Sequence, residues 1–127
     1  MKLALAQTAV FASPWKYWKL SDDDLRALEH QVMENPLAGK VMRNTSGVRK
    51  IRFAPPSGRS GKSGGYRVCY FYYLVFETIY FVLVFPKSEQ PNLSAEQERA
   101  CRSLAKQISD ALDKSRQPRE RKQRRIN

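Results

Sequence analysis

Six basic side chains and no acidic one lie between residues 49 and 68. Because successive side chains of a β-strand point to opposite faces, Lys50 and Arg52 are expected to share one face, while Ile51 and Phe53 enter a core on the other. Cations that are side by side on a sheet can bind phosphate groups and stabilise negative charge. A second interpretation is a solvated basic strand that discourages sheet-to-sheet aggregation.

The positive charge of the chain is concentrated in two blocks. The 127 residues carry a formal net charge of +11. Residues 49–68 have six basic and no acidic side chains, and residues 114–127 have seven basic and one acidic, which gives +6 in each block. Two cationic blocks on a near-neutral body indicate a polyanionic partner. We predict a domain over residues 1–113 and a basic, disordered or partner-ordered tail over 114–127, which could also be merely solubilising.

Cysteine, histidine and glycine patterns argue against several kinds of site. Cys69 and Cys101 have no Cys-x-x-Cys or Cys/His spacing, so both are predicted to be buried small hydrophobic residues in a reducing compartment. His30 falls on the polar side of its predicted helix. Gly61-Lys62-Ser63 imitates the end of a P-loop, but Pro56 replaces the first glycine and a strand follows. We therefore expect neither a metal ion nor a cofactor.

The apolar segments are too short for a leader or a membrane span. Residues 1–12 imitate a secretory leader, but Gln7 and Thr8 interrupt it. The longest apolar stretch, residues 70–85, is broken by Glu77 and Thr78. The chain is long enough for one domain with a single core, and the cytoplasm is the expected compartment.

A short strand over residues 3–8 and then two helices are predicted in the N-terminal part. Ser13-Pro14 would cap and begin a helix over Trp15 to Leu20. Ser21 would cap a second helix, which ends at Asn35-Pro36. The two helices are expected to form a helical hairpin. The apolar face of the second helix is predicted to contain Leu25, Leu28, Val32 and Met33.

Three runs rich in aromatic and β-branched residues follow, over residues 48–54, 66–75 and 78–85. They are expected to pair as an antiparallel meander, which with the first strand gives a mainly four-stranded antiparallel sheet. Ser94 begins a capping box with Gln97 for a C-terminal helix that covers one face of this sheet. The predicted fold class is therefore mixed α/β (α+β).

Five short motifs follow one another along the chain in a specific order. They are Asn35-Pro36, Arg49-Lys50-Ile51-Arg52-Phe53-Ala54, the segment Gly61 to Phe71, Phe85-Pro86-Lys87-Ser88-Glu89 and Asn92-Leu93-Ser94. In this order and spacing, which cover about Leu3 to Leu112, the chain resembles the RelE/HigB family of toxins from toxin–antitoxin systems, specifically its HigB-like branch.

The resemblance implies a fold, an activity and partners. The fold would be the RelE-like microbial ribonuclease fold. The activity would be metal-independent cleavage of messenger RNA on the translating ribosome, which inhibits translation. A cognate antitoxin would neutralise the toxin. In the HigB-like branch this antitoxin usually carries a helix-turn-helix domain, so that operator DNA would be bound only through the antitoxin.

The resemblance also implies site residues. Lys50 and Arg52 match the family's paired cations on one strand, Arg67 matches the strand arginine after a Gly-Tyr step, and Lys87 matches the cation that closes the last strand. Ser88 stands where some relatives have arginine, and the following segment lacks the tyrosine that some relatives use in catalysis. The predicted catalytic residues are Lys50, Arg52, Arg67, Lys87 and Glu89, and the predicted RNA-binding residues are Arg49, Arg59, Lys62 and Tyr66.

Each catalytic role follows from the chemistry of the side chain. Cleavage of RNA without a metal requires a base for the 2′-hydroxyl, positive charge at the phosphorus and an acid for the 5′-oxygen. Arg52 and Arg67 stay protonated at neutral pH, which suits them to stabilise charge. Lys50 is the first candidate base because neighbouring cations favour its neutral form, Glu89 is the second, and Lys87 is the candidate acid.

Two other functions use the same basic face. A non-catalytic RNA- or ribosome-binding protein would need the same cations. A DNA-binding component of a toxin–antitoxin operon is the third possibility, but the predicted helix pair is followed by strands and not by a recognition helix. The leading prediction is the ribosome-dependent endoribonuclease.

Overall fold

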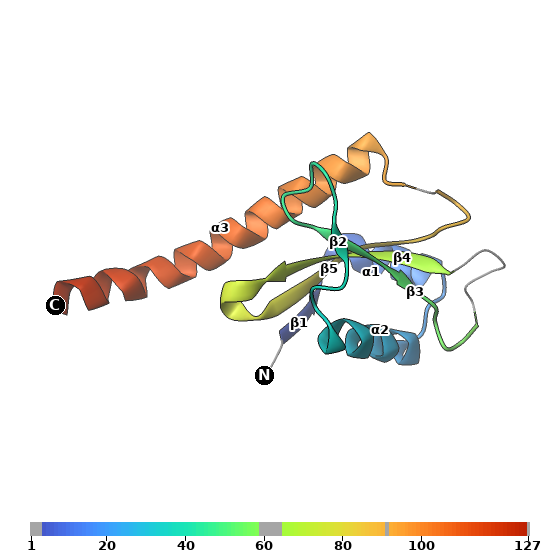
Figure 1. Ribbon diagram of the computed structural model, residues 1–127, viewed down its shortest axis with the longest axis horizontal. Helices are drawn as coiled ribbons and strands as arrows, with labels where there is room; N and C mark the ends of the chain where they lie inside the picture. Colours follow the sequence, from blue (N-terminus) through green and yellow to red (C-terminus); the bar gives the residue numbers. More distant parts are fainter. Residues whose placement is uncertain (1–3, 59–64, 91, 127) are drawn as a thin grey trace.

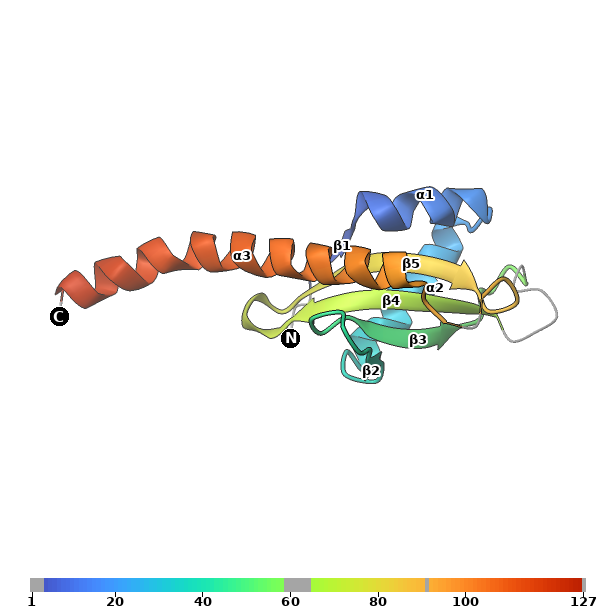
Figure 2. The same cartoon turned by 90° about the horizontal axis from the view of Figure 1, so that it is seen from above.

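In a computed structural model the chain forms one five-stranded sheet with helices on both faces (Figures 1 and 2). The structure describes residues 4–58, 65–90 and 92–126, with the backbone alone for Ala4 and residues 116–126. The mixed α/β class is as predicted. The elements are β1 (Ala4–Gln7), α1 (Ala9–Tyr17), α2 (Asp22–Glu34), β2 (Lys40–Val41), β3 (Arg49–Phe53), β4 (Tyr66–Tyr73), a 3-10 turn (Leu74–Phe76), β5 (Thr78–Pro86) and α3 (Ala95–Ile126).

The sheet has the strand order β1-β5-β4-β3-β2. The pairings β3–β4 and β4–β5 are antiparallel, which confirms the predicted meander. β1 pairs with β5 in parallel, from Ala4 opposite Thr78 to Gln7 opposite Phe81. The prediction of four strands was wrong because β2 adds a fifth. β2 has only two residues, which is too short for an alternating pattern to be visible in the sequence.

The first helix begins earlier than predicted. Thr8, and not Ser13, is its N-cap, because the Thr8 side chain accepts a hydrogen bond from the backbone N–H of Phe11 at 3.2 Å. Pro14 lies inside the helix, where its missing N–H removes one backbone hydrogen bond. The helix persists because Phe11 and Trp15, one turn apart, are both buried in the core.

The second helix agrees with its predicted bounds. Ser21 forms the capping box at its start, and Asn35 is its C-cap. Leu28 and Val32 are buried as predicted, but Met33 is 39% exposed, so its place on the apolar face was wrong. α1 packs mainly on β5, whereas α2 contacts the end of β3. The two helices lie on the same face of the sheet (Figure 2).

Two apolar clusters occupy the two faces of the sheet. The cluster under α1 and α2 includes Phe11, Leu28, Phe81 and Tyr70. The cluster under α3 includes Cys69, Phe85, Cys101 and Ala105. Both cysteines are buried and free, as predicted. Burial raises the pKa of the Cys101 thiol to about 11.

The third helix has the predicted capping box: Gln97 N donates to Ser94 Oγ at 3.1 Å and Ser94 N donates to Gln97 Oε1 at 3.0 Å. α3 continues to Ile126 and extends beyond the edge of the sheet (Figure 1). The backbone of residues 114–126 is therefore helical. The prediction of a disordered or partner-ordered tail and the division of the chain at residue 113 both stay predictions.

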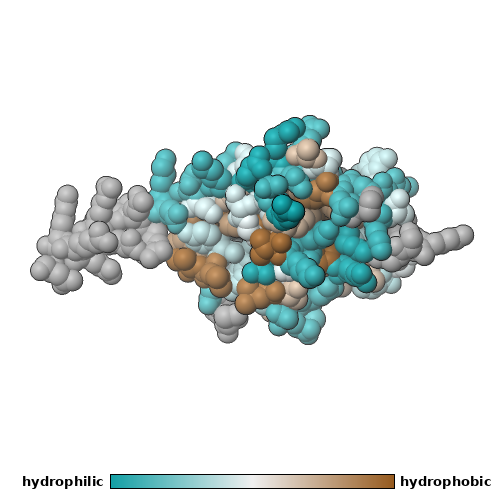
Figure 3. Space-filling view, turned by 45° about the horizontal axis from the view of Figure 1, so that its top comes forward, coloured by the Kyte–Doolittle hydropathy of each residue, from teal (hydrophilic) through white to brown (hydrophobic). Residues whose placement is uncertain are grey.

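On the face shown in Figure 3, hydrophobic side chains form separate patches among hydrophilic ones. The exposed apolar residues include Leu74, Val75 and Phe76 of the turn between β4 and β5. Within the described part of the chain, none of the helices combines the length and the apolar character that a membrane crossing requires.

Candidate functional site

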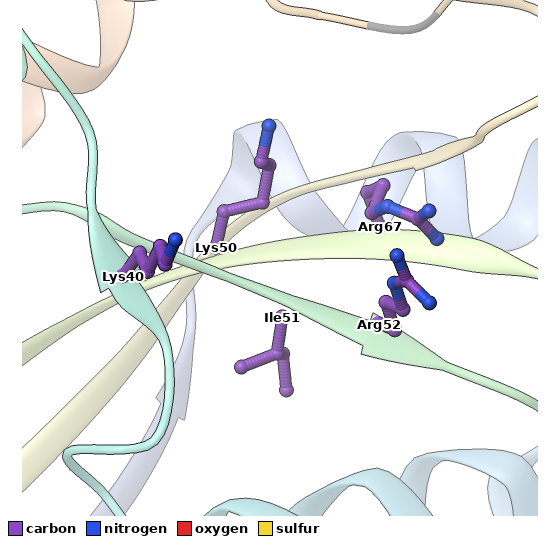
Figure 4. A pocket seen from close by; sticks show the side chains of 5 residues that line it. All are labelled: Lys40, Lys50, Ile51, Arg52 and Arg67. Carbon is purple, nitrogen blue, oxygen red and sulfur yellow. The ribbon is translucent and has the colours of Figure 1, made fainter.

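A pocket of about 300 Å³ opens on the sheet at β2, β3 and β4 (Figure 4). Its lining consists of four cationic residues and one apolar residue, and no acidic residue is among them. These residues are Lys40, Lys50, Ile51, Arg52 and Arg67. Three of the predicted catalytic residues, Lys50, Arg52 and Arg67, therefore line one pocket, and the predicted Lys87 does not line it.

Strand alternation and register bring the cations together. Arg52 on β3 lies opposite Arg67 on β4, and Lys40 on β2 lies opposite Lys50 on β3. Directly opposite residues of an antiparallel pair project to the same face. Ile51 points to the other side of the sheet (Figure 4), where it packs against the core under α1 and α2. The pocket thus lies on the same face of the sheet as α3.

Arg67 is the most enclosed of the four cations. Its side chain is only 7% exposed, and one guanidinium N–H donates to the carbonyl oxygen of Tyr66 at 3.3 Å. Burial, and then the neighbouring charge of Arg52, lower the pKa of Arg67. An arginine nevertheless stays protonated at neutral pH. A fixed, poorly hydrated positive charge at the wall of the pocket is suited to bind an anion.

Lys40 is a pocket residue that the sequence analysis missed. It lies at the start of β2, and its side chain is exposed. The one local sequence feature that could have indicated the position of Lys40 is Gly39, the residue before it. A Cβ on Gly39 would lie 3.0 Å from Ile51 Cγ2 and 3.0 Å from the Tyr70 hydroxyl. Glycine therefore allows this segment to approach β3 closely and brings Lys40 to the pocket.

The side chains of Tyr70 and Arg49 hold the segment before Lys40 in place by hydrogen bonds. The Tyr70 hydroxyl donates to Pro36 O at 2.7 Å and accepts a hydrogen bond from Gly39 N at 3.1 Å. One guanidinium nitrogen of Arg49 donates to Gly39 O at 2.7 Å and to Leu37 O at 3.2 Å. Burial raises the pKa of Tyr70, so this hydroxyl stays protonated and keeps its donated hydrogen bond.

Neither of the two predicted RNA-binding residues that the structure describes lines the pocket. Arg49 is engaged with the backbone before β2, on the opposite face from Lys50, and it does not line the pocket. Tyr66 is 3% exposed and belongs to the core, which argues against the RNA contact that we predicted for it. Arg59 and Lys62 lie outside the described residues.

Lys87 and Glu89 do not line the pocket either. Both are exposed in the turn after β5. Lys87 N donates to Gly65 O at 3.1 Å, and Glu89 N donates to Pro86 O at 3.1 Å. The backbone of Lys87 therefore lies beside the beginning of β4, the strand that carries Arg67. The catalytic roles of both residues stay predictions.

The place of His30 agrees with the sequence interpretation. His30 is on the surface of α2, where its Nε2 lies 3.2 Å from Glu34 Oε1. In the ranges that the structure describes, there is no group of three His, Cys, Asp or Glu residues that could hold a metal ion.

Comparison with known proteins identifies a family, and two E. coli structures are among the solved structures that match. The family model described as the RelE toxin of the RelE/RelB toxin–antitoxin system matches residues 5–122. A mutant of the E. coli toxin RelE in the free state is 21% identical, with a TM-score of 0.49, over 72% of this chain and 90% of that chain. A chain of the intact E. coli RelBE toxin–antitoxin complex is 22% identical, with a TM-score of 0.47, over 65% of this chain and 94% of that chain. Assignment to the HigB-like branch stays a prediction.

Proposed function

The chain belongs to the RelE toxin family of toxin–antitoxin systems, and from this premise we propose that it cleaves messenger RNA on the ribosome and thereby inhibits translation. The observation that carries the proposal is the pocket lined by Lys40, Lys50, Arg52 and Arg67. Four cations without an acidic neighbour in the lining form a site for a polyanion. The phosphate backbone of RNA has this chemistry.

In the proposed reaction the 2′-oxygen attacks the adjacent phosphorus and the 5′-oxygen leaves. Arg52 and Arg67, which lie opposite each other, would hold the phosphate and stabilise the charge that accumulates on it. Lys50, two residues from Arg52 on the same face, would accept the 2′-hydroxyl proton. Lys87 would protonate the leaving 5′-oxygen, and no metal ion would take part.

Dependence on the ribosome follows from the composition of the pocket. Its lining contains neither a carboxylate nor an imidazole, so a strong general base is not built into it. Positioning the 2′-oxygen in line with the phosphorus can contribute roughly 7 kcal/mol or more to lowering the barrier. We propose that the ribosome supplies this positioning, which would make cleavage of free RNA slow.

A cognate antitoxin is the proposed protein partner, because the family is named for toxins of toxin–antitoxin pairs. We propose that this antitoxin carries a helix-turn-helix domain and that operator DNA is bound only through it. Both partners would act in the cytoplasm.

Loss of the arginine pair tests the proposed activity. Arg52→Ala and Arg67→Met should each lower messenger cleavage by about 100-fold or more, because each removes a charged donor from the reacting phosphate. The measurement is mapping of messenger 5′ ends after induced expression, with a translation-blocked transcript beside the translated one. Arg26→Ala is the matched control, since Arg26 is 76% exposed on α2 and away from the pocket.

The outcomes separate the enzyme from a binding protein. A non-catalytic RNA- or ribosome-binding protein is the second candidate, because the pocket lining contains no carboxylate or imidazole. Growth arrest by the unaltered protein without new messenger 5′ ends would establish this second function. Undiminished cleavage by folded Arg67→Met would refute the role of Arg67.

A further inference from the structure

We propose that the pocket binds two consecutive phosphates of a single RNA strand, and that Lys40 holds the phosphate on the 5′ side of the one held by Arg52 and Arg67. The proposal deepens the proposed function, since it takes RNA as the ligand of the same pocket. It assigns to Lys40 a contact that neither the motif pattern nor the family match identifies.

The four cations form two pairs along β3. Lys40 lies opposite Lys50, and Arg52 lies opposite Arg67. Figure 4 shows the two guanidinium groups together at one end of the pocket and the two lysines at the other. Lys50 and Arg52 are two residues apart on one strand, which separates the pairs by about 6.7 Å along β3. This spacing is comparable to that of neighbouring phosphates on an extended RNA strand.

The position of Lys50 fits the order of groups in RNA. A nucleotide's 2′-hydroxyl lies between its own 5′ phosphate and the 3′ phosphate that it attacks. Lys50 lies on β3, the strand between β4 with Arg67 and β2 with Lys40, and it is two residues from Arg52. A strand with its reacting phosphate at the arginine pair and its preceding phosphate at Lys40 would therefore bring the 2′-hydroxyl towards Lys50.

The charge of the pocket exceeds that of one phosphodiester. Each phosphodiester carries one negative charge, whereas the described lining of the pocket has three positive side chains besides Lys50, the proposed base, and no negative one. Like charges face each other in the site, because Arg52 lies opposite Arg67 and, after burial, its charge is the second cause of the lowered pKa of Arg67. A second phosphate would neutralise more of this repulsion than one phosphate can.

The fold holds the segment of Lys40 in place. The Tyr70 hydroxyl and the Arg49 guanidinium make four hydrogen bonds to the backbone between Pro36 and Gly39. The hydrogen bond from Gly39 N to the Tyr70 hydroxyl is buried. An exposed lysine that binds no ligand would not need hydrogen bonds that hold the backbone before it in place. Tyr70 and Arg49 are thus positioning residues for Lys40, although the same bonds also stabilise the edge of the sheet.

The test uses two trinucleotide probes with 2′-O-methyl groups that block cleavage and a fluorescent label. One probe has two phosphodiesters, and the other has a neutral methylphosphonate in place of the 5′ phosphodiester. Fluorescence anisotropy of the purified full chain gives both affinities. The unaltered protein should bind the doubly charged probe several-fold more tightly. Its logarithmic salt slope should be steeper by about 0.7, the value for one more phosphate contact on a single strand.

Lys40→Gln should weaken binding of the doubly charged probe several-fold more than binding of the singly charged probe, and so remove the gain from the second phosphate. Lys40→Arg should restore the gain, and Tyr70→Phe should reduce it because the segment of Lys40 loses two hydrogen bonds. Lys16→Gln is the matched control, since Lys16 is an exposed lysine on α1.

Two results would overturn the proposal. One is an equal loss of affinity for both probes in Lys40→Gln. This result would show that Lys40 contributes only to the general positive potential of the pocket and does not form a phosphate subsite. The other is the absence of any gain from the second phosphate in the unaltered protein. Failure of the enzymatic function is distinguishable, because the probes report binding: a Lys40-dependent gain without messenger cleavage would retain the subsite and reject only the nuclease.

Discussion

The carboxylate of Asp24 joins the start of α2 to the connection that leaves β3. Asp24 is fully buried. Its carboxylate accepts hydrogen bonds from Ser21 N at 3.0 Å, Ser57 N at 3.1 Å and Ser57 Oγ at 2.8 Å. One residue therefore completes a helix cap and fixes the chain shortly after β3, the strand that carries Lys50 and Arg52.

We expect Asp24→Ala to lower the free energy of unfolding by about 3 kcal/mol. Loss of the capping interaction costs about 1 kcal/mol. A hydrogen bond to a charged group contributes roughly 1.5–3 kcal/mol, and two backbone N–H groups lose their acceptor. We take about 2 kcal/mol for the Ser57 connection, because water can reach part of the emptied site.

Urea unfolding followed by circular dichroism measures this change. For a slope of about 2 kcal/mol per molar urea, the midpoint should fall by about 1.5 M. Asp23→Ala is the matched control: the neighbouring carboxylate is 86% exposed and accepts a hydrogen bond from Arg26 at 3.2 Å. It should change stability by about 0.5 kcal/mol. Equal midpoints for the two variants would refute the reasoning.

Two further predictions concern pH and backbone conformation. Burial alone would raise the pKa of Asp24, but its hydrogen bonds with Ser21 and Ser57 outweigh burial and leave the pKa lowered. The difference in free energy of unfolding between the unaltered protein and Asp24→Asn should thus be largest at neutral pH. It should shrink below about pH 4, as the carboxylate of the folded protein becomes protonated. Urea midpoints of the two proteins that differ equally down to pH 2 would contradict this. Gly65→Ala should destabilise more than Gly58→Ala in the same assay, because both have positive φ (+77° and +76°) but only at Gly65 would a Cβ meet Phe53 O, at 2.7 Å. Equal losses of stability in the two variants would show that the backbone at Gly65 can shift without a cost in free energy.

Strand alternation made the centre of the site predictable. Lys50 and Arg52 were placed on one face because Ile51 and Phe53 between and beside them are apolar, and the structure has this arrangement. The same rule carries a signal that the prediction did not use. A residue next to a pocket residue on a strand points away from the pocket, so Arg49 beside Lys50 and Tyr66 beside Arg67 belong to the other face.

The remaining features depend on contacts between distant segments. β2 exists because Lys40 and Val41 pair with β3, and two residues have no periodicity to read. The start of α1 was misplaced because Ser13-Pro14 is a good local start signal. Thr8 nevertheless caps the helix, since its hydroxyl also donates to Phe81 O at 3.0 Å on β5, a contact that local sequence cannot show.

The parallel pairing of β1 with β5 has a consequence for synthesis of the chain. β1 is translated before its partner strand, which begins at Thr78. The strands β3, β4 and β5 pair with their neighbours in the sequence, and closing the longer loop back to β1 costs more entropy. β1 must therefore remain unpaired until β5 has been synthesised. The strands that carry the cationic pocket can assemble before the molecule closes its N-terminal edge.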